Sequence, residues 1–490
     1  MNFIEKVVSI FSPKAAFNRM RFRAATAVLE SQARKYEAAS GGRRTDGWKT
    51  AGGSPNTEIR SALSRLRERH RDMVRNNPYA ENAVARITNN TVGAGIRPSI
   101  SGKESSYNVK RVKKYWKDWA ETKACDYDGQ HNFYGLQAIA LRAVIESGEV
   151  LIRKRRVTGQ EIPIKLQVVE GDLLDHTKDI EYFAEGNGWI IQGVEFDKYG
   201  KRVAYWMYDR HPDDALEINS RRIPAEDILH IYHKKRPGQV RGVPFGTSSM
   251  MRLKDFDDYE DAELVRQKIA ACFSVFIEDA NPDAALSTSS DASGEMRERV
   301  EPGIIEHLPP GKTVTFAQPP TTQGYEAYSR KILQGISAGY GISYEALTND
   351  LTGVNFSSGR MGWLEFQRNI TDWQENMLVP MMCNDVWSWF MESLQIIGAV
   401  SKPMQATWTP PRREMIDPLK ETKGMTSAIR AGLISWQESV RQMGYDPELT
   451  LEELAADAKK FTEFGLVLDS DARNDVPPDS GGDGGGDPAQ

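Results

Sequence analysis

The sequence contains few cysteines and no closely spaced pair of them. Cys125, Cys272 and Cys383 are odd in number and far apart in a chain of 490 residues, which argues against a disulfide framework and a thiolate zinc site. Isolated cysteines of this kind are typical of a reducing compartment. The sequence therefore predicts an intracellular protein.

Long apolar runs are also missing. No segment approaches the roughly 18–20 consecutive apolar residues that are needed to span a bilayer, so we expect no membrane partner. The start, MNFIEKVVSIFSPK, is a poor signal peptide, because Glu5 and Lys6 interrupt its apolar run and no small-residue cleavage pattern follows. A soluble protein is expected.

Motifs of the common catalytic classes are absent as well. There is no G-x-S-x-G nucleophile elbow, and Gly311-Lys312-Thr313 lacks the upstream glycine of a GxxxxGK[ST] phosphate loop. The pair His230 and His233 lies in ILHIYH, a pattern typical of a strand, where positions i and i+3 face opposite sides. We therefore predict no catalytic residue, no metal site and no cofactor.

The densest group of carboxylates lies in KDFDDYEDAELV. A two-metal nuclease needs several carboxylates that converge on cations about 4 Å apart. Asp257 and Asp261 share one helix face, but the six carboxylates between 255 and 263 spread around most of the circumference. We favour a solvated helix start, stabilised by the helix dipole. A cytosolic metal-dependent nucleic-acid-processing enzyme that uses residues 255–263 is the alternative.

Charge is unevenly distributed along the chain. Residues 1–120 carry 24 Lys and Arg against 10 Asp and Glu, and the remaining residues carry 39 against 58. The first part is suited to meeting a polyanion, and most of the rest would repel one. Four arginines in the first part are predicted to contact DNA phosphates without recognising a base sequence. The alternative is that they form a solvated, salt-bridged helix face or contact acidic protein partners. The four arginines are Arg65, Arg67, Arg69 and Arg71.

Hydrophobic periodicity predicts an α+β fold in which helices enclose a strand-rich stretch at 148–233. The helices are expected at 58–70, 78–92, 109–121, 133–146, 325–340 and 361–391, with shorter ones in 413–465. A further helix of about thirty residues is expected from Ser248, because Ala262, Val265, Ile269, Phe273 and Phe276 recur at helical spacing. The stretch WQENMLVPMMCNDVWSWF is expected to be core rather than a surface for stacking nucleobases. Such long, partly polar helices favour packing beside copies of the same chain.

Two ends of the chain have the composition of non-globular segments. Residues 1–60 are basic and increasingly rich in Gly, Ser and Thr, which predicts a flexible arm. The end, DVPPDSGGDGGGDPAQ, cannot bury apolar surface and is expected to be disordered. The polar stretch 281–298 is expected to be loose for the same reason.

Five stretches carry a resemblance to a known family. They are RNNPYAENAVARITNNTVGAGI, RPGQVRGVP, RLKDFDDYEDAELVRQKIAACF, PPGKTVTFAQPP and YGISYEALTNDLTGVNFSSGRMGWLEFQR. On these residues the sequence resembles the tailed-phage portal proteins of the lambda-like family. The stretches follow one another in family order within residues 60–440, so the resemblance covers most of the chain.

The resemblance implies a ring of subunits, usually twelve, around a DNA channel at one capsid vertex. It implies long stem and spine helices, a β-rich wing, a small α/β clip and a helical crown. The implied parts are the arm (1–60), wing (61–240), stem helix (241–278), clip (279–320), second stem helix (321–345), tunnel loop (346–360), spine helix and return to the wing (361–412), crown (413–466) and acidic Gly-rich tail (467–490).

The tunnel loop is the part that the resemblance places against DNA. The residues expected to line the channel are Asn349, Asp350, Thr352, Asn355, Ser357, Ser358 and Arg360. Most of them are short and uncharged, which suits weak, transient contacts, and we expect Asp350 and Arg360 to pair with each other. A strongly basic channel would hold DNA through counterion release, so the acidic balance after residue 120 favours a conduit of low friction.

The resemblance also implies partners and a location. The partners are further copies of the chain, double-stranded DNA bound without sequence specificity, terminase, head-completion or adaptor proteins, and the major capsid and scaffold proteins. The location is the capsid vertex of the virion, and the host cytoplasm during assembly. A scaffold outside phages whose basic arm recruits nucleic acid is a third hypothesis, and such a protein would not close into a ring.

Asparagines flank the helix predicted at 78–92. Asn76 and Asn77 precede it, and Asn89 and Asn90 lie at its end. The first and last backbone groups of a helix have no partner inside it, and amide side chains can bond them. Our hypothesis is that these asparagines satisfy backbone groups where the helix docks among neighbouring strands and subunits.

Overall fold

The computed structural model describes residues 52–100, 106–181, 188–214, 219–271, 275–279, 312–316, 324–412, 415 and 417–467. The chain divides into two compact units, residues 1–54 and 55–490, and the fold below is that of the second. Most of the predicted arm, the stretch 281–298 and nearly all of the predicted tail lie outside the described residues. The predicted arm extends too far, because Pro55–Arg60 form helix α3.

Helices α4 (Leu63–Asn76) and α5 (Pro78–Thr91) confirm the first two predicted helices. Asn77 lies between them with an extended backbone, and its side-chain oxygen accepts hydrogen bonds from Tyr79 N (3.0 Å) and Ala80 N (3.2 Å). These two N–H groups begin α5 and have no partner within the helix. The hypothesis that asparagines satisfy backbone groups is therefore confirmed for Asn77.

Replacing Asn77 with Ala is expected to lower the free energy of unfolding by about 1–2 kcal/mol, because two N–H groups lose their acceptor. Thermal unfolding followed by circular dichroism measures the change. Asn76→Ala is the matched control: Asn76 is exposed and its amide donates to the side chain of Asp72 (2.7 Å), so a change within about 0.5 kcal/mol is expected. Equal losses in the two variants would contradict the capping role.

Helices α6 (Ser106–Ala120) and α7 (Phe133–Ser147) precede the strands and confirm the next two predicted helices. The predicted strand-rich stretch forms two antiparallel sheets, with strand orders β3-β2-β8 and β4-β5-β6-β7. The strands are β2 (Glu149–Arg156), β3 (Ile164–Glu170), β4 (Trp189–Ile191), β5 (Val194–Phe196), β6 (Arg202–Tyr208), β7 (Ser220–Pro224) and β8 (Ile228–Tyr232). His230 lies within β8, as the strand prediction requires.

Short elements join these sheets to the rest of the unit. Strand β1 (Arg97–Ser99) pairs antiparallel with β11 (Thr407–Thr409). This pairing joins the segment after α5 to the segment after the helix at Asn384–Ile396. Single turns of 3-10 helix occur at Lys123–Cys125, Gly171–Leu173, Pro212–Asp214, Ala225–Asp227 and Phe245–Ser248.

Helix α8 (Met250–Ala271) is shorter than the predicted helix of about thirty residues. Phe276, which periodicity placed on the same helix, lies in strand β9 (Val275–Asp279), and β9 pairs antiparallel with β10 (Lys312–Phe316). Val, Phe and Ile in succession favour a strand when a second strand is present to pair with them. The helix in the segment predicted as the stem, 241–278, therefore ends before the end of that segment.

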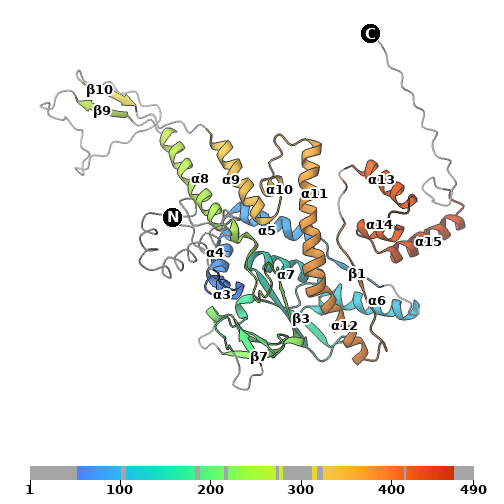
Figure 1. The fold of residues 1–490 in the computed structure, drawn as a ribbon. Coiled ribbons are helices and arrows are strands. Elements are labelled where there is room, and N and C mark those ends of the chain that lie inside the picture. Colours follow the sequence, from blue (N-terminus) through green and yellow to red (C-terminus); the bar gives the residue numbers. More distant parts are fainter. Residues whose placement is uncertain are drawn as a thin grey trace, which may run out of the picture. The chain divides into compact units, whose positions relative to one another are not determined.

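The predicted helix at 361–391 is confirmed as part of a longer helical rod (Figure 1). It begins as α11 (Phe356–Asp372), continues as a π-helix (Trp373–Cys383) and ends as α12 (Asn384–Ile396). The π segment contains Pro380, which has no N–H to donate and whose ring crowds the preceding turn of an α-helix. The wider π register accommodates that residue, so the rod continues past it.

The remaining helices confirm the pattern seen in the sequence. Helix α9 (Tyr325–Tyr340) has the bounds that were predicted and ends at Gly341, which has a φ of 74°. The C-terminal helices are α13 (Pro418–Arg430), α14 (Trp436–Gln442) and α15 (Pro447–Glu463). Among the described residues, no helix is both long enough and apolar enough to cross a membrane.

The main hydrophobic core joins segments that are far apart in the sequence. It contains buried side chains of α5, α7 and β2 together with α9 and the long rod, and the aromatic residues Trp387, Trp389 and Phe390 lie in it. The predicted core role of that tryptophan-rich segment is confirmed. A second, smaller cluster packs around Leu151, Val194 and Tyr205 within the strand-rich module.

Candidate functional site

The loop between α10 (Tyr344–Thr348) and α11 comprises residues 349–355. The predicted range of 346–360 is too long at both ends, because α10 extends to Thr348 and α11 begins at Phe356. Three residues expected in the loop lie in the first turns of α11 instead: Ser357, Ser358 and Arg360. Asn349, Asp350, Thr352 and Asn355 remain in the loop.

Both ends of this loop are fixed by local hydrogen bonds. Asn355 begins α11 with a capping box: its side chain accepts from Ser358 N (2.8 Å), and Ser358 Oγ accepts from Asn355 N (3.1 Å). Asn349 ends α10 with a φ of 57°, a left-handed conformation that Asn tolerates better than most residues. The capping preference of Asn and Ser is the reason why α11 starts earlier than predicted.

Asp350 stabilises the turn inside the loop. Its carboxylate accepts hydrogen bonds from the Tyr344 hydroxyl (3.0 Å) and from Thr352 N (2.9 Å). Hydrogen bonds from Thr352 and Tyr344 lower the pKa of Asp350, so the group is ionised at neutral pH. The expected pairing of Asp350 with Arg360 is wrong, because the carboxylate accepts hydrogen bonds from Tyr344 and Thr352 instead.

The loop is open to solvent. Asn349, Thr352 and Asn355 are exposed, and Leu351 exposes 69% of its surface. Our reading of the sequence did not single out Leu351, because an isolated leucine between polar residues gives no periodic signal. Residues 349–355 contain one carboxylate and neither Lys nor Arg, so the exposed surface of the loop is nearly neutral.

Side chains from two other helices hold the base of the loop. Asn82 on α5 donates to the carbonyl oxygens of Ala346 (3.0 Å) and Leu347 (2.6 Å), and Arg86 donates to Asn349 Oδ1 (2.6 Å). From α9, Arg330 donates to the carbonyl oxygen of Thr352 (3.3 Å) and its guanidinium lies 5.4 Å from the centre of the Tyr344 ring. The sequence shows only that Asn82 and Arg86 share a helix face.

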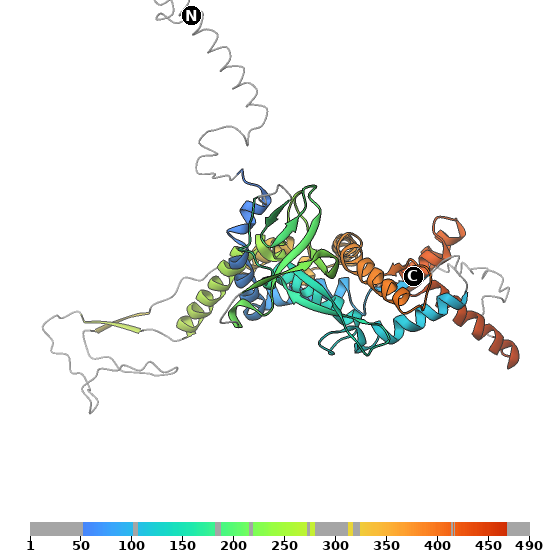
Figure 2. The same cartoon turned by 90° about the horizontal axis from the view of Figure 1, so that it is seen from below.

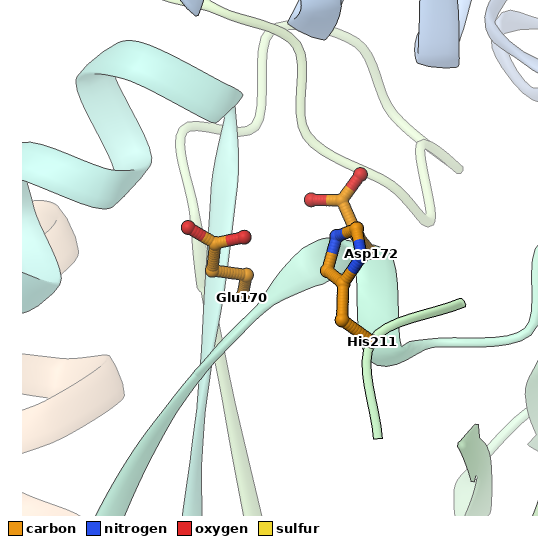
Figure 3. A group of neighbouring side chains, drawn as sticks. All are labelled: Glu170, Asp172 and His211. Atoms are coloured by element: carbon orange, nitrogen blue, oxygen red, sulfur yellow. The ribbon is translucent and has the colours of Figure 1, made fainter. Parts of the chain in front are cut away.

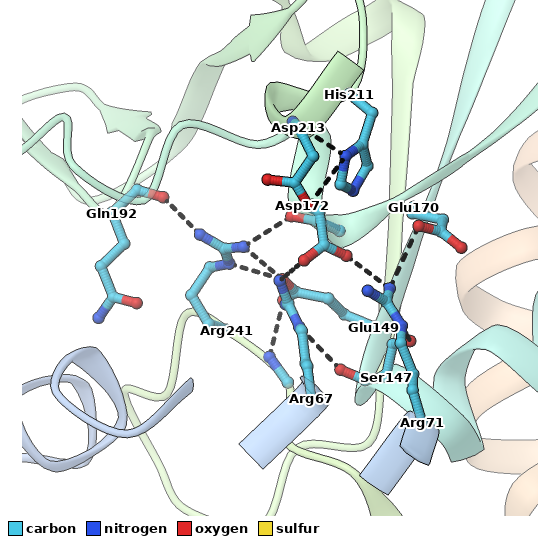
Figure 4. Close-up of polar contacts among 12 residues, drawn as sticks. Arg67, Arg71, Ser147, Glu149, Glu170, Asp172, Gln192, His211, Asp213 and Arg241 are labelled. Carbon is cyan, nitrogen blue, oxygen red and sulfur yellow. Dashed lines mark hydrogen bonds and ion pairs between the residues drawn. The ribbon is translucent and has the colours of Figure 1, made fainter. Parts of the chain in front are cut away.

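A buried ionic cluster links α4 to the two sheets (Figure 4). Glu149, at the start of β2, is fully buried and pairs with Arg67, with Arg241 (2.5 Å) and with His230 (3.0 Å). Its second oxygen also accepts from Gly242 N (2.8 Å). Burial would raise the pKa of Glu149, but Arg241 and Arg67 hold it well below its usual range. Burial lowers the pKa of His230 to about 4, so that ring is neutral at pH 7.

Two of the four arginines predicted as possible phosphate contacts, Arg67 and Arg71, belong to this ionic cluster instead. Arg67 is only 3% exposed and pairs with Glu149, and Arg71 pairs with Asp172 (2.5 Å) and Glu170 (3.2 Å). Neither guanidinium is available to DNA, because its partners come from strand segments packed against α4. Arg65 and Arg69 are exposed. Of the two alternative predictions, a salt-bridged helix face agrees better with the structure than a phosphate-binding surface does.

One group of side chains has the geometry of possible metal ligands (Figure 3). Oxygen and nitrogen atoms of Glu170, Asp172 and His211 lie within 4.8 Å of one another. The guanidinium of Arg71 already bonds both carboxylates and supplies the positive charge there. We therefore interpret the group as part of the ionic cluster.

The carboxylates at 255–263 do not converge. Within the described part of the chain, the group of side chains close enough to share a metal ion is the trio near Arg71, and no such group lies on α8. Asp258 pairs with Lys254, Glu263 pairs with Arg266 (2.5 Å), and Glu260 accepts from the Tyr325 hydroxyl (3.2 Å). This arrangement gives no support to the alternative of a two-metal enzyme.

The comparisons with known proteins identify a structural protein of tailed phages. Residues 41–374 match the family described as "Phage portal protein, lambda family". This match spans more than half of the chain, so the chain belongs to the lambda family of phage portal proteins. Portal proteins are structural components of the virion, located at the head–tail connection of the capsid, and are not enzymes. The predicted family, class and location are thereby confirmed.

Several known proteins are similar to this chain over most of its length. The probable portal protein of Halomonas phage phiHAP-1 is 27% identical over 82% of this chain and 81% of its own length. Portal protein B of Escherichia phage lambda is 22% identical over 81% of this chain and 84% of its own length. Among solved structures, the neck of a native gene transfer agent particle matches with a TM-score of 0.45 and 12% identity, over 80% of this chain and 94% of that chain.

Proposed function

We propose that identical copies of this portal protein close into a ring around a passage for double-stranded DNA. The family membership supports this, and the resemblance of the sequence motifs implies twelve copies. Two helices of the described unit also support packing between copies. Leu264 and Val265 on α8 expose 51% and 53% of their surface, and Met361 on α11 exposes 63%. Packing of copies against these helices would remove such apolar side chains from water, which is favourable.

The parts of the subunit take the roles that the family suggests. We assign the wing to the helices and sheets between 61 and 240, and the stem to α8 and α9. Figure 2 shows α8 projecting from the strand-rich module, as a stem helix would. Strands β9 and β10 belong to the clip, the rod from α11 to α12 is the spine, and α13 to α15 form the crown.

The loop at residues 349–355 is the part proposed to meet DNA. The single observation that carries this role is an exposed, nearly neutral loop held at its base by α5 and α9. In a ring, each loop is repeated around one axis. Neutral loops make weak contacts with a duplex, whereas rows of unpaired cations would hold its phosphates and slow its passage.

The ring also needs partners at its two ends and around its rim. We propose that it docks terminase during packaging and head-completion or adaptor proteins afterwards, and that the capsid and scaffold proteins surround it during assembly in the host cytoplasm. The segment from α13 to α15 exposes Leu419 on α13, Leu433 in the turn before α14 and Leu454 on α15, at 67%, 82% and 54%. These surfaces are available for association with other proteins or with further copies.

Negative-stain electron microscopy of the purified full chain tests the proposal. The expected result is closed rings with a central hole wide enough for duplex DNA, and no magnesium-dependent cleavage of DNA by the same sample. The second measurement is needed because it separates the portal from the alternative enzyme. Monomers that never close and that cut DNA when magnesium is added would overturn the proposal.

A further inference from the structure

Helix α5 holds the loop through two side chains on one face. Asn82 and Arg86 are one helical turn apart, so both point to the same side. The Asn82 amide donates to two successive carbonyl oxygens at the end of α10. Carbonyl oxygens at a helix end receive no hydrogen bond from within the helix, so Asn82 supplies the missing donor. Asn82 is therefore a positioning residue, and it brings Arg86 to the first residue of the loop, Asn349.

Arg86 differs in its partner from the arginines of the wing that pair with carboxylates. Its guanidinium bonds the neutral amide oxygen of Asn349, is exposed to solvent, and forms no ion pair with a carboxylate of the described residues. Arg142, by contrast, is paired with Glu81 (2.6 Å), and Arg71 with Asp172 (2.5 Å). A guanidinium has five N–H donors. Arg86 thus keeps its full charge and several donors for an anion.

Arg330, the second arginine at the loop, differs from Arg86 in its partners. Arg330 stacks on Tyr344 and donates to the loop carbonyl of Thr352. It lies close enough to Asp350 to interact with its carboxylate, and this carboxylate also accepts from the Tyr344 hydroxyl. Asp350 therefore partly offsets the charge of Arg330. Of these two arginines, Arg86 has no carboxylate partner among the described residues.

We propose that Arg86 is a phosphate-binding residue, and that its guanidinium exchanges Asn349 for a phosphate oxygen of the DNA backbone. The proposal rests on the proposed contact between the loop and DNA. Guanidinium groups match the geometry of phosphate oxygens and bond them more strongly than a neutral amide oxygen. The contact reads no sequence. Asn349 competes with the phosphate for the guanidinium, so each contact is weaker than one made by an arginine without an internal acceptor.

Salt dependence of DNA binding by assembled rings tests the assignment. The affinity for a fluorescent linear duplex is measured by anisotropy at a series of NaCl concentrations. Each lost phosphate contact reduces the slope of log K against log[salt] by roughly 0.9. Arg86→Gln is expected to reduce the slope by about that amount or more, and Arg86→Lys, which keeps the charge, is expected to retain it.

Two further variants separate phosphate binding from positioning of the loop. Asn349→Gly removes the acceptor of Arg86 but tolerates the φ of 57°, so it loosens the loop without removing a cation and is expected to keep the wild-type slope. Arg221→Gln is the matched control for charge, because Arg221 is exposed and paired with Asp209 (2.9 Å) in the wing. It is also expected to keep the wild-type slope.

The outcomes distinguish this inference from the proposed function. If Arg86→Gln leaves the slope unchanged, or if Asn349→Gly reduces it equally, Arg86 does not bind phosphate. Thr352→Glu places a negative charge on the exposed loop and is expected to weaken DNA binding wherever the loop approaches the duplex. If Thr352→Glu weakens binding while Arg86→Gln keeps the slope, the loop contact stands and the Arg86 assignment fails. If wild-type rings bind no duplex at any salt concentration, both the loop contact and the Arg86 assignment fail, whereas failure of the chain to close into rings overturns the proposed function.

Discussion

Replacing Glu149 with Gln is expected to lower the free energy of unfolding by about 3–5 kcal/mol. Gln has nearly the shape of Glu, so packing is preserved and only the negative charge is lost. Arg67 and Arg241 would then remain buried without their shared carboxylate. Urea unfolding at a fixed protein concentration measures the change as a lower midpoint.

Glu392→Gln is the matched control for this experiment. Glu392 is 59% exposed and pairs with Lys154 (3.3 Å), and ion pairs at an exposed carboxylate contribute about 0–1 kcal/mol. A much smaller shift of the midpoint is therefore expected. If the two variants lose the same stability, the buried cluster does not hold α4 to the sheets in the way that its geometry indicates.

Replacing Gly242 with Ala is expected to lower the free energy of unfolding by about 3 kcal/mol or more, because the added methyl group has no space. A Cβ at this position would lie 2.0 Å from the carbonyl oxygen of Gly148 and 2.7 Å from Tyr232 Cβ. The backbone cannot move aside freely, since Gly242 N also donates to Glu149 (2.8 Å). Thermal unfolding measures the loss as a lower melting temperature.

Gly424→Ala is the control for the same chemical change at an open position. Gly424 lies inside α13, and a Cβ there meets no atom within 4 Å. Alanine favours a helix interior over glycine by roughly 0.5–1 kcal/mol, so this variant is expected to be slightly more stable than the wild type. A melting temperature for Gly242→Ala equal to or above that of wild type would show that the turn at 241–244 can relax.

Helices and strands were predictable where local pattern alone determines them. Helix α9 has the predicted bounds, and the strand-rich stretch lies where alternating residues placed it. The prediction failed where a partner distant in sequence decides the conformation. Phe276 continues a helical pattern, yet it pairs with Thr315 across β9 and β10. Such a pairing cannot be inferred from the spacing of residues along one segment.

The presence of a loop near residue 350 was predictable from the sequence, and its bounds and contacts were not. The loop was found because its motif is long and polar, and its neutral composition is visible in the sequence. Its true ends depend on the cap at Asn355, and its anchoring depends on Asn82 and Arg86, which precede it by more than 250 residues. Leu351 at the exposed surface gave no periodic signal at all.

By itself, the sequence determined the family, the order of helices and strands and the absence of the common catalytic motifs, because ordered motifs and periodicity are properties of the chain alone. Only the tertiary structure decided which arginines are free to meet DNA. Arg67 was predicted either to contact phosphates or to lie on a solvated, salt-bridged face, and it is instead buried against Glu149, 82 residues away. Burial and pairing depend on which segments pack together, and that information is not contained in any one stretch of sequence.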